Sequence, residues 1–460
     1  MASCPTITSM LRLFLMAAAL AVLCVSGKEN LFAYVDEALE SAVFDKLGTE
    51  CLAVHSWATD PSANSGLMHG KRPTFWYDLS AHRPRNLIEA AVLRLRTLIP
   101  ATMLGNSTVR GAEWWVQVRS KEEGITFHYD KDEGLASIKG IMKHPAVSTV
   151  TYLSDIGAPT LIFEMITIDG NQEVPEIPDA GFLSYPRKNR HIMFSGDLQH
   201  GVLGSAAPRL AEAGNRVTLL INWWSDPPIE PNTVVLTDDL ARENKHLRTL
   251  VSEDFVAPPL ETRAVEVEVE APSGGFSSSS GIVYAPTQTL EIPPVSSGLA
   301  VRHTVTFPPG DLHFLYLPAN VPPGQVYEVK WADDQCYGSL GLLDLLHSNQ
   351  VNQLFRLPQP KLLLMYESLD NNNLYEAILT AVLPLAKKMQ GHIKVYLCPT
   401  SSCANALEAF GLTRGDLPRA VIDDTKAQKK HVQKKGSWQP TTAALESFIH
   451  SSLPNLQGIF

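Results

Sequence analysis

The pattern of hydrophobic and polar positions changes along the chain, from helical spacing to strands and then to alternating strands and helices. In residues 30–47 and 86–99, hydrophobic side chains recur at about the helical period, which predicts two helices. From Trp114 to Trp224, short hydrophobic runs are separated by Gly and Pro clusters, which predicts strands. The predicted strands cover residues 114–119, 125–130, 147–153, 160–166, 191–195 and 216–224. Several strands without intervening helices predict a barrel or sandwich, with the helices buttressing it.

The segment after Pro228 has a different character. Residues 229–337 are rich in Pro and Ser and contain further strand patterns at 303–317 and 325–331. Val and Glu alternate without a break from Val265 to Glu270, which predicts a half-exposed strand. The Gly- and Ser-rich run that follows predicts a loop or linker. We therefore predict an irregular β-rich module in this segment and assign it no function.

Strands and helices alternate in the last part of the chain, residues 338–455. Strands are predicted at 361–366, 392–397 and 417–422, and helices at 374–389, 404–410 and 442–452. This order predicts an α/β domain. Together with the earlier patterns it predicts a multidomain α+β protein. Its predicted parts are a signal segment (1–27), a strand-rich domain with N-terminal helices (28–228), the β-rich module (229–337) and the α/β domain (338–455).

The N-terminal segment has the features of a secretory signal peptide. Arg12 is its only charged residue, and an uncharged run from Leu13 to Gly27 is rich in Leu, Ala and Val. The small residues at Val25-Ser26-Gly27 suit cleavage before Lys28. The run is short for a membrane span, although a retained signal anchor is the alternative. We therefore expect the endoplasmic reticulum lumen or secretion, with no membrane span beyond this segment.

Charge and cysteine content narrow the expected partners and compartment. The formal net charge of −10 argues against nucleic acid as a partner. Four cysteines follow the signal segment, and in an oxidising compartment they fit one or two disulfides with three pairings open. They are Cys51, Cys336, Cys398 and Cys403. Asn106 begins an Asn-Ser-Thr sequon, so we expect a glycoprotein.

Two strand-like stretches carry candidate metal ligands. His128 and Asp130 are two residues apart, so on a strand their side chains leave the same face. His200 lies in the second stretch, residues 194–202, and is the natural third ligand. Two His and one carboxylate on one face of a metal leave positions open, as in non-haem Fe(II) oxygenases. The alternatives are that these histidines are buried structural residues, or that Asp132 is the carboxylate ligand.

A candidate anion-binding residue opens the last predicted strand of this domain. Arg216 is followed by a hydrophobic run, and a buried Arg in that position needs a partner such as a carboxylate. Thr218 lies two residues further and faces the same side. Arg209 is the rival, but Pro208 and Ala211 place it in a loop. A surface ion pair is the other alternative for Arg216.

The ordered set of His-x-Asp, distal His and Arg-x-Thr resembles the Fe(II)/2-oxoglutarate-dependent oxygenase superfamily, over roughly residues 110–226. The resemblance implies a double-stranded β-helix (jelly roll) with the metal at its open end. It implies that His128, Asp130 and His200 hold Fe(II), and that Arg216 and Thr218 bind the distal carboxylate of 2-oxoglutarate. The three metal ligands and Arg216 are the expected catalytic residues. Tyr152 and Thr160 fall where such enzymes line the co-substrate pocket, although core packing is an equal explanation for Tyr152. The resemblance leaves a need for ascorbate open.

The α/β domain resembles thioredoxin-like domains, and especially the non-catalytic b′-type domain of protein disulfide isomerases. The resemblance rests on the order of elements and on the Gly-Leu…Leu-Pro spacing that ends at Pro418. It implies a cis peptide bond between Leu417 and Pro418. A redox Cys-x-x-Cys pair would follow the first strand, but Tyr366-Glu367-Ser368-Leu369 stands there. Cys398 and Cys403 are separated by four residues, so we interpret them as structural.

These observations predict a secretory-pathway Fe(II)/2-oxoglutarate-dependent hydroxylase. A lumenal location with a thioredoxin-like module favours a protein or peptide substrate, such as a prolyl or lysyl side chain. Prolyl 4-hydroxylases usually have Lys where Arg216 stands, whereas lysyl hydroxylases have Arg, so the substrate stays open. The alternative hypothesis is a non-enzymatic binding or chaperone-like protein that uses both domains as scaffolds.

Overall fold

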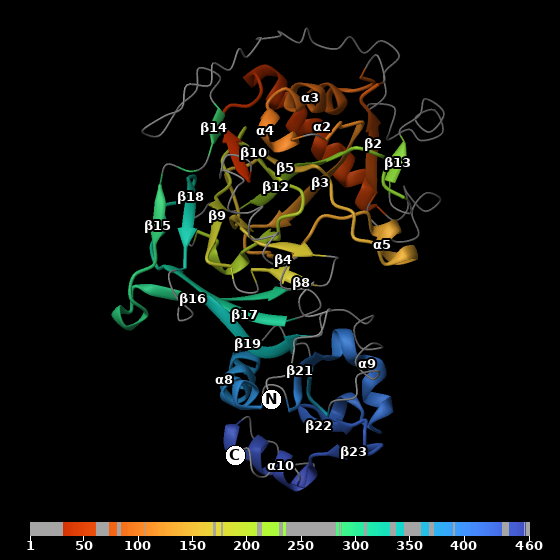
Figure 1. The fold of residues 1–460 in the computed structure, drawn as a ribbon, viewed down its shortest axis with the longest axis vertical. Helices are drawn as coiled ribbons and strands as arrows, with labels where there is room; N and C mark the ends of the chain where they lie inside the picture. The colour runs from red at the N-terminus through yellow and green to blue at the C-terminus, as the bar shows by residue number, and fades with distance from the viewer. Residues whose placement is uncertain are drawn as a thin grey trace, which may run out of the picture. The chain divides into compact units, whose positions relative to one another are not determined.

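The computed structural model describes residues 31–60, 73–80, 84–105, 107–168, 172–175, 178–208, 214–229, 233–235, 282–284, 286, 288–307, 311–331, 337–344, 360–367, 372–389, 392–434, 441–454 and 456. The chain folds into two compact units. Unit 1 comprises residues 1–300 and 318–332, and unit 2 comprises residues 301–317 and 333–460. The protein is α+β and rich in strands (Figure 1). The predicted signal segment, the Val265–Glu270 strand, Asn106 and Arg209 lie outside the described residues.

Unit 1 is built on an eight-stranded sheet, here called the major sheet, with the strand order β13-β2-β3-β12-β5-β10-β1-β14. The strands are β13 (Thr233–Val235), β2 (Thr74–Asp78), β3 (Gly111–Ser120), β12 (Asn215–Trp224), β5 (Val147–Tyr152), β10 (His191–Ser195), β1 (Phe32–Val35) and β14 (Ile282–Tyr284). The three strands at its centre, β3, β12 and β5, pair antiparallel in an unbroken register. They correspond closely to strands that the hydrophobic pattern predicted.

A six-stranded sheet, the minor sheet, has the order β15-β18-β9-β6-β11-β4. Its strands are β15 (Thr289–Glu291), β18 (Val326–Lys330), β9 (Ala180–Ser184), β6 (Thr160–Phe163), β11 (His200–Val202) and β4 (Ile125–His128). A small hairpin, β7 (Ile166–Ile168) and β8 (Gln172–Val174), stands apart from both sheets. The rings of Phe32 on β1 and Phe182 on β9 stack 4.7 Å apart, so the two sheets pack face to face.

The first predicted helix is wrong in its first half. Phe32–Val35 forms strand β1, and the helix α2 spans Ser41–Thr59 instead of residues 30–47. The strand forms because β1 pairs with β10 on one side and β14 on the other, and these partners are distant in sequence. The second predicted helix is confirmed as α3 (Leu87–Arg96), whose N-cap is Asn86 accepting from the Glu89 backbone N–H. Two short helices follow, α4 (Ala101–Leu104) and α5 (Glu133–Lys139).

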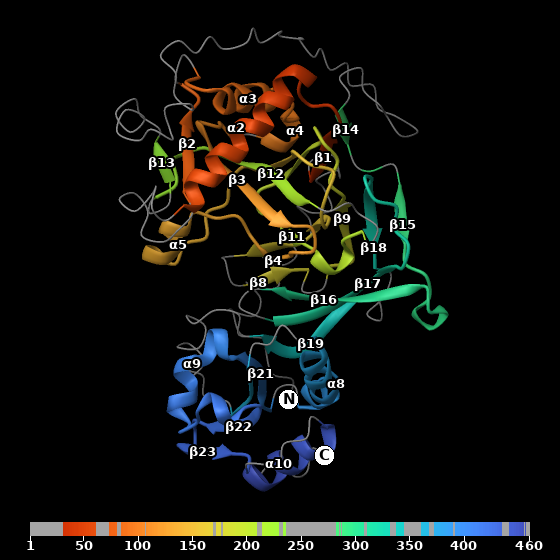
Figure 2. The same cartoon turned by 180° about the vertical axis from the view of Figure 1, so that it is seen from behind.

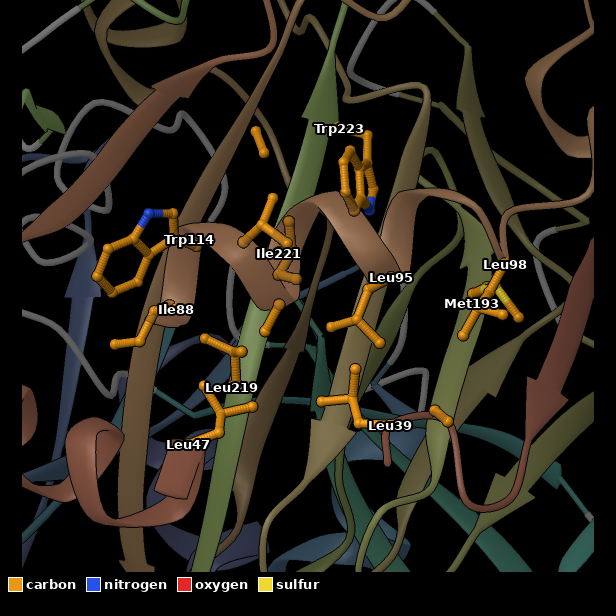
Figure 3. Close-up of a cluster of buried hydrophobic side chains, with 14 of the residues drawn as sticks. Leu39, Leu47, Ile88, Leu95, Leu98, Trp114, Met193, Leu219, Ile221 and Trp223 are labelled. Atoms are coloured by element: carbon orange, nitrogen blue, oxygen red, sulfur yellow. The ribbon is translucent and has the colours of Figure 1, made fainter. Parts of the chain in front are cut away.

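Helices α2 and α3 cover one face of the major sheet (Figures 1 and 2). Figure 3 shows the core between them, where Leu219, Ile221 and Trp223 of β12 meet side chains of both helices. Alternation along β12 then turns Arg216, Thr218 and Asn222 to the opposite face, toward the minor sheet. Because Leu219, Ile221 and Trp223 pack in the helix-side core, the alternate residues of β12 face the interior between the two sheets.

The described strands of residues 229–337 belong to sheets that also contain strands from earlier or later parts of the sequence. Within unit 1, β13 and β14 extend the major sheet, while β15 and β18 extend the minor sheet. Two further strands, β16 (Ala300–Phe307) and β17 (Asp311–Pro318), belong to the sheet of unit 2. The segment is thus distributed over three sheets in the described part of the chain.

Unit 2 contains a seven-stranded sheet with the order β16-β17-β19-β21-β20-β22-β23. The remaining strands are β19 (Tyr337–Asp344), β21 (Lys394–Pro399), β20 (Lys361–Tyr366), β22 (Arg419–Asp424) and β23 (Lys429–Val432). Helices α8 (Asn372–Lys388) and α10 (Thr442–Ser452) pack on one face, and α9 (Thr400–Ala409) packs on the other. Figure 2 shows α8 and α9 on opposite sides of β21. The Leu417–Pro418 peptide bond is cis, as expected.

The side chains of two of the four cysteines that follow residue 27 are described. Cys51 is a free, buried thiol, whereas Cys398 is disulfide-bonded to a partner whose side chain lies outside the described residues. None of the described helices has both the length and the hydrophobicity that a membrane span requires.

Candidate metal centre

Pairing of β11 with β4 brings two histidines together. His200 on β11 and His128 on β4 are direct cross-strand partners in an antiparallel pair. Cross-strand partners point to the same face, and their ring centroids lie 4.6 Å apart. Asp130 follows β4 by two residues and keeps to the same side as His128. Residues far apart in sequence therefore converge because of the register of the minor sheet.

The ligating atoms of these three side chains surround a common point. The Nε2 atom of His128 lies 3.8 Å from Oδ1 of Asp130, and the Nε2 atom of His200 lies 3.5 Å from Oδ2. One ligating atom of each residue lies within 4.8 Å of the others. His200 is almost buried, whereas the His128 side chain is 40% exposed. The cluster is therefore closed on one side and open on the other.

Backbone hydrogen bonds orient both imidazoles. The Nδ1 atom of His128 lies 2.8 Å from the Thr126 carbonyl oxygen, and Nδ1 of His200 lies 3.0 Å from the Leu198 carbonyl oxygen. A carbonyl only accepts, so each Nδ1 carries a proton, and in the neutral imidazole Nε2 then presents its lone pair to the centre. This is the arrangement in which metal-binding histidines are usually held.

Neighbouring polar groups fix the Asp130 carboxylate. Ser148 Oγ on β5 donates to Oδ2 of Asp130 over 2.7 Å, and Asn222 on β12 also hydrogen-bonds to it. The backbone carbonyl of Asp130 accepts from His144 Nδ1 over 2.7 Å. Sequence reasoning missed all three supporting residues. Asn222 could have been found, because it lies on the same face of its predicted strand as Arg216 and Thr218.

Burial and charge act in opposite directions on this cluster. Burial favours the neutral acid of Asp130, but the charges of His200 and His128 and the bonds from Ser148 and Asn222 outweigh it, so its pKa is lowered. Burial lowers the pKa of His200 to about 4, against the opposing attraction of Asp130. At neutral pH Asp130 is therefore a carboxylate and His200 a neutral imidazole, which are the protonation states that a metal ion requires.

The donor set fits a divalent transition metal of the Fe(II) type. It consists of two imidazole nitrogens and one carboxylate around a common point, and the His128 side of the cluster is exposed. Asp132, the rival carboxylate, accepts hydrogen bonds from two backbone N–H groups. It caps α5 by accepting from the Leu135 backbone N–H, and it also accepts from the backbone N–H of Ile229. Its carboxylate is therefore used to join two backbone segments.

Arg216 is buried on the interior face of β12. Its Nε donates to the Ala158 carbonyl oxygen over 3.2 Å, and one terminal nitrogen donates to Thr160 Oγ1 over 2.8 Å. Burial is the main cause that lowers its pKa, and the partners found for it among the described residues are a carbonyl, a hydroxyl and the Tyr152 side chain. A buried guanidinium with only neutral partners provides a site for an anion.

A glycine makes room for the aliphatic stem of Arg216. A Cβ atom on Gly157 would lie 2.5 Å from the Cβ of Arg216, and the φ angle of Gly157 is +117°, which L side chains rarely adopt. The loop that contains Gly157 and Ala158 therefore packs directly on Arg216. Its close approach is what lets the Ala158 carbonyl accept from Nε.

The remaining predicted residues lie beside Arg216. The ring of Tyr152 is 5.3 Å from the guanidinium carbon, and its hydroxyl donates to Thr160 Oγ1 over 2.8 Å. Tyr152 is fully buried, so it packs in the core and also contacts the site. Thr218 Oγ1 is buried and has no hydrogen-bond partner among the described residues. The four residues thus form one cluster with spare hydrogen-bonding capacity.

A cavity of about 220 Å³ adjoins the open side of the histidine–carboxylate cluster. His128, Asp130 and Asn222 line it together with the apolar side chains of Trp115 and Ile229. Its other lining residues are Thr74, Glu113, Tyr129, Lys131, Glu133, Gly134 and Pro228. The cavity is large enough for one side chain of a larger molecule and lies where a reacting group could approach a bound metal.

His191 does not belong to the cluster. It lies on β10 with Nδ1 2.8 Å from Thr151 Oγ1, and it is completely buried. Because β10 alternates, His191 faces the same side as Met193, which packs in the helix-side core. Its role is therefore structural.

The chain is similar to one protein family and to several solved structures. The family model described as a thioredoxin-like domain matches residues 329–451. No curated protein matches the chain. Among solved structures, similar ones include a prolyl-4-hydroxylase from Pseudomonas putida, with 17% identity, a TM-score of 0.26, and coverage of 47% of this chain and 94% of that one.

Two further solved structures are each similar to a part of the chain. HygX from Streptomyces hygroscopicus, with nickel and 2-oxoglutarate bound, shows 18% identity and a TM-score of 0.27, covering 45% of this chain and 88% of its own. The bb fragment of ERp72 shows 18% identity and a TM-score of 0.22, covering 32% of this chain and 68% of its own. The C-terminal part of this chain, residues 329–451, is a thioredoxin-like domain.

Proposed function

We propose that the protein is an Fe(II)- and 2-oxoglutarate-dependent dioxygenase of the secretory pathway that hydroxylates a protein or peptide side chain. The convergence of His128, Asp130 and His200 on one point carries this proposal. The two facing sheets of unit 1 would then form a double-stranded β-helix, with the metal between β4 and β11. The thioredoxin-like domain would accompany this catalytic unit.

The residues of this chain fit the roles that such a reaction needs. His128, Asp130 and His200 would hold Fe(II), which with 2-oxoglutarate and dioxygen supplies oxidative decarboxylation to succinate and insertion of an oxygen atom into a substrate C–H bond. Ser148 and Asn222 would keep the Asp130 carboxylate ionised and in place.

Arg216 would bind the distal carboxylate of 2-oxoglutarate. Its guanidinium is buried beside Thr160 and Tyr152, and a carboxylate is the partner that best matches a guanidinium. The unpartnered hydroxyl of Thr218 could donate a further hydrogen bond to the same group. Binding there would exclude water from this end of the interior.

The 220 Å³ cavity would accept the substrate side chain. It opens beside His128 and Asp130, and Trp115 and Ile229 offer apolar surface to an aliphatic group. Its size admits one side chain, so the main part of a polypeptide substrate would stay outside. Whether a prolyl, lysyl or other side chain enters would depend on Trp115, Ile229 and the other lining residues.

An anaerobic titration of the purified full-length chain tests this function. Addition of Fe(II) and then 2-oxoglutarate should give a visible metal-to-ligand charge-transfer absorption, and admission of dioxygen should release succinate. His200→Ala should lose both signals, whereas His392→Ala, an exposed histidine of unit 2, should retain them. Absence of Fe(II) binding by the correctly folded chain would instead favour the non-enzymatic binding protein.

A further inference from the structure

Among the described strands, the sheet of unit 2 ends at β23, which pairs with β22 on one side only. A cavity of about 470 Å³ lies between this edge strand and α10. Figure 1 shows β23 and α10 next to each other at the end of unit 2. The cavity is lined by His431, Val432, Gln433, Lys434, Ala444, Ser447, Phe448, Ser451 and Ser452. It is separate from the candidate metal centre, which belongs to unit 1.

Two polar side chains in this cavity have buried atoms that lack partners. His431 and Gln433 are two residues apart along the edge, so both point to the α10 side. The Nε2 atom of His431 and the Oε1 atom of Gln433 are buried and have no hydrogen-bond partner among the described residues. Gln433 is only 7% exposed, and its backbone N–H is held by the Ala420 carbonyl. Buried polar atoms are nearly always hydrogen-bonded, so these two indicate a ligand that supplies the bonds.

The cavity also offers apolar surface and positive charge. Phe448 and Ala444 of α10 form its apolar wall. Lys434 lines one end, and Lys429 is exposed at the other end of β23, where it forms no ion pair with a described residue. Asp424, opposite Lys429 in the register, already accepts from the backbone N–H of Ala427. The charges along this edge therefore favour an anionic partner.

We propose that this groove binds an extended acidic segment of a partner polypeptide, which adds as a further strand to the edge of β23 that no described strand covers. A peptide backbone carries both a donor and an acceptor in each residue, so it can satisfy the outer edge of β23 together with His431 and Gln433. Alternate side chains of the added strand face α10 and contact Phe448. A carboxylate on the segment meets Lys429.

Lysines on an edge strand have a second explanation. They can simply prevent unwanted pairing with other chains, which needs no ligand. That explanation accounts for Lys429 but not for the unpartnered atoms of His431 and Gln433 inside a cavity. The two explanations predict opposite results when a strand-forming peptide is offered.

The test measures fluorescence anisotropy of a short labelled peptide that alternates Glu and Val, titrated with the full-length chain. We expect saturable binding, and reduced hydrogen exchange of the β23 amides when the peptide is present. The same peptide with Lys in place of Glu, or with Pro in place of Val, should bind at least about tenfold more weakly.

Two variants locate the binding site. Ser447→Trp fills the cavity from an exposed position of α10, and Lys429→Glu reverses the charge at the edge; each should weaken binding about tenfold or more. Lys394→Glu makes the same charge change at an exposed position on β21 and should bind like the unmodified chain. Unchanged binding by both test variants, equal binding of the Pro-containing peptide, or no binding of the Glu–Val peptide by the folded chain would each overturn the proposal.

Discussion

His128 and His200 face each other across the β4–β11 pair, with ring centroids 4.6 Å apart. The register between these short strands shifts between His200 and Val202, so the pairing at the histidines is local. A shift of one residue would turn His200 to the other face of the sheet. The candidate metal site therefore depends on the pairing of two short strands, and it can be tested one ligand at a time.

Removal of one ligand should abolish metal binding. In the unmodified chain, Fe(II) or Ni(II) should raise the midpoint of thermal unfolding, because a ligand that binds only the folded state stabilises it. His200→Ala should remove this metal-dependent rise, since one of three ligands is lost. Differential scanning fluorimetry with and without chelator measures the effect. An undiminished rise in the variant would place the metal elsewhere.

Asn222→Leu should weaken metal binding without removing a ligand. The substitution deletes a hydrogen bond to Asp130 and keeps a similar volume at a buried position. Loss of such a supporting bond typically lowers metal affinity by about 10- to 100-fold. Competition with a fluorescent chelator gives the affinity. The control is Ser80→Ala, which removes a side-chain hydrogen bond to Asp78 at an exposed turn and should leave metal affinity unchanged.

Arg216→Lys should reduce 2-oxoglutarate affinity while it keeps the charge. Lysine lacks the planar fork that pairs with a carboxylate at two points, and the bond to Thr160 would also change. Loss of one charge-assisted bond corresponds to a roughly 10-fold weaker affinity or more. Isothermal titration of the Ni(II)-loaded chain measures it. Arg110→Lys, at an exposed site, should have no effect; an equal loss in both variants would contradict the role of Arg216.

Gly157→Ala should disturb the site through Arg216. The added Cβ would lie 2.5 Å from the Cβ of Arg216 at a φ of +117°, so either the loop or the guanidinium must move. We expect a lower thermal midpoint together with weaker 2-oxoglutarate binding. Gly140→Ala is a matched control for backbone strain, since Gly140 also has positive φ but open space around its Cβ position. If both variants lose 2-oxoglutarate affinity equally, general strain is the cause.

His191 should make unit 1 less stable in acid. Burial lowers its pKa from 6.5 to about 3, so below about pH 6.5 the unfolded chain binds a proton that the folded chain does not. Folding stability should therefore fall as the pH drops from about 6.5 toward 3, by at most ~1.4 kcal/mol per pH unit from this residue. Urea unfolding at several pH values, compared between the unmodified chain and His191→Gln, isolates the contribution. A variant with the same pH dependence would exclude His191 as its source.

Several elements could be predicted because their signals are local. Strand β10, strand β20 and helix α10 have the bounds that the pattern of their own residues predicted. The cis peptide bond at Pro418 followed from the resemblance to thioredoxin-like domains. In contrast, Phe32–Val35 was assigned to a helix, since its strand forms only through pairing with β10 and β14.

The sequence by itself determined which side chains could form the metal site: the His-x-Asp spacing puts two ligands on one face, and alternation along β12 puts Arg216 and Thr218 on another. The tertiary structure decided that these faces meet. Only the β4–β11 register brings His200 to His128, and only the packing of β5 and β12 brings Ser148 and Asn222 to Asp130. The sequence could not show these contacts, because pairing between distant strands depends on the whole packed sheet and leaves no local periodic signal.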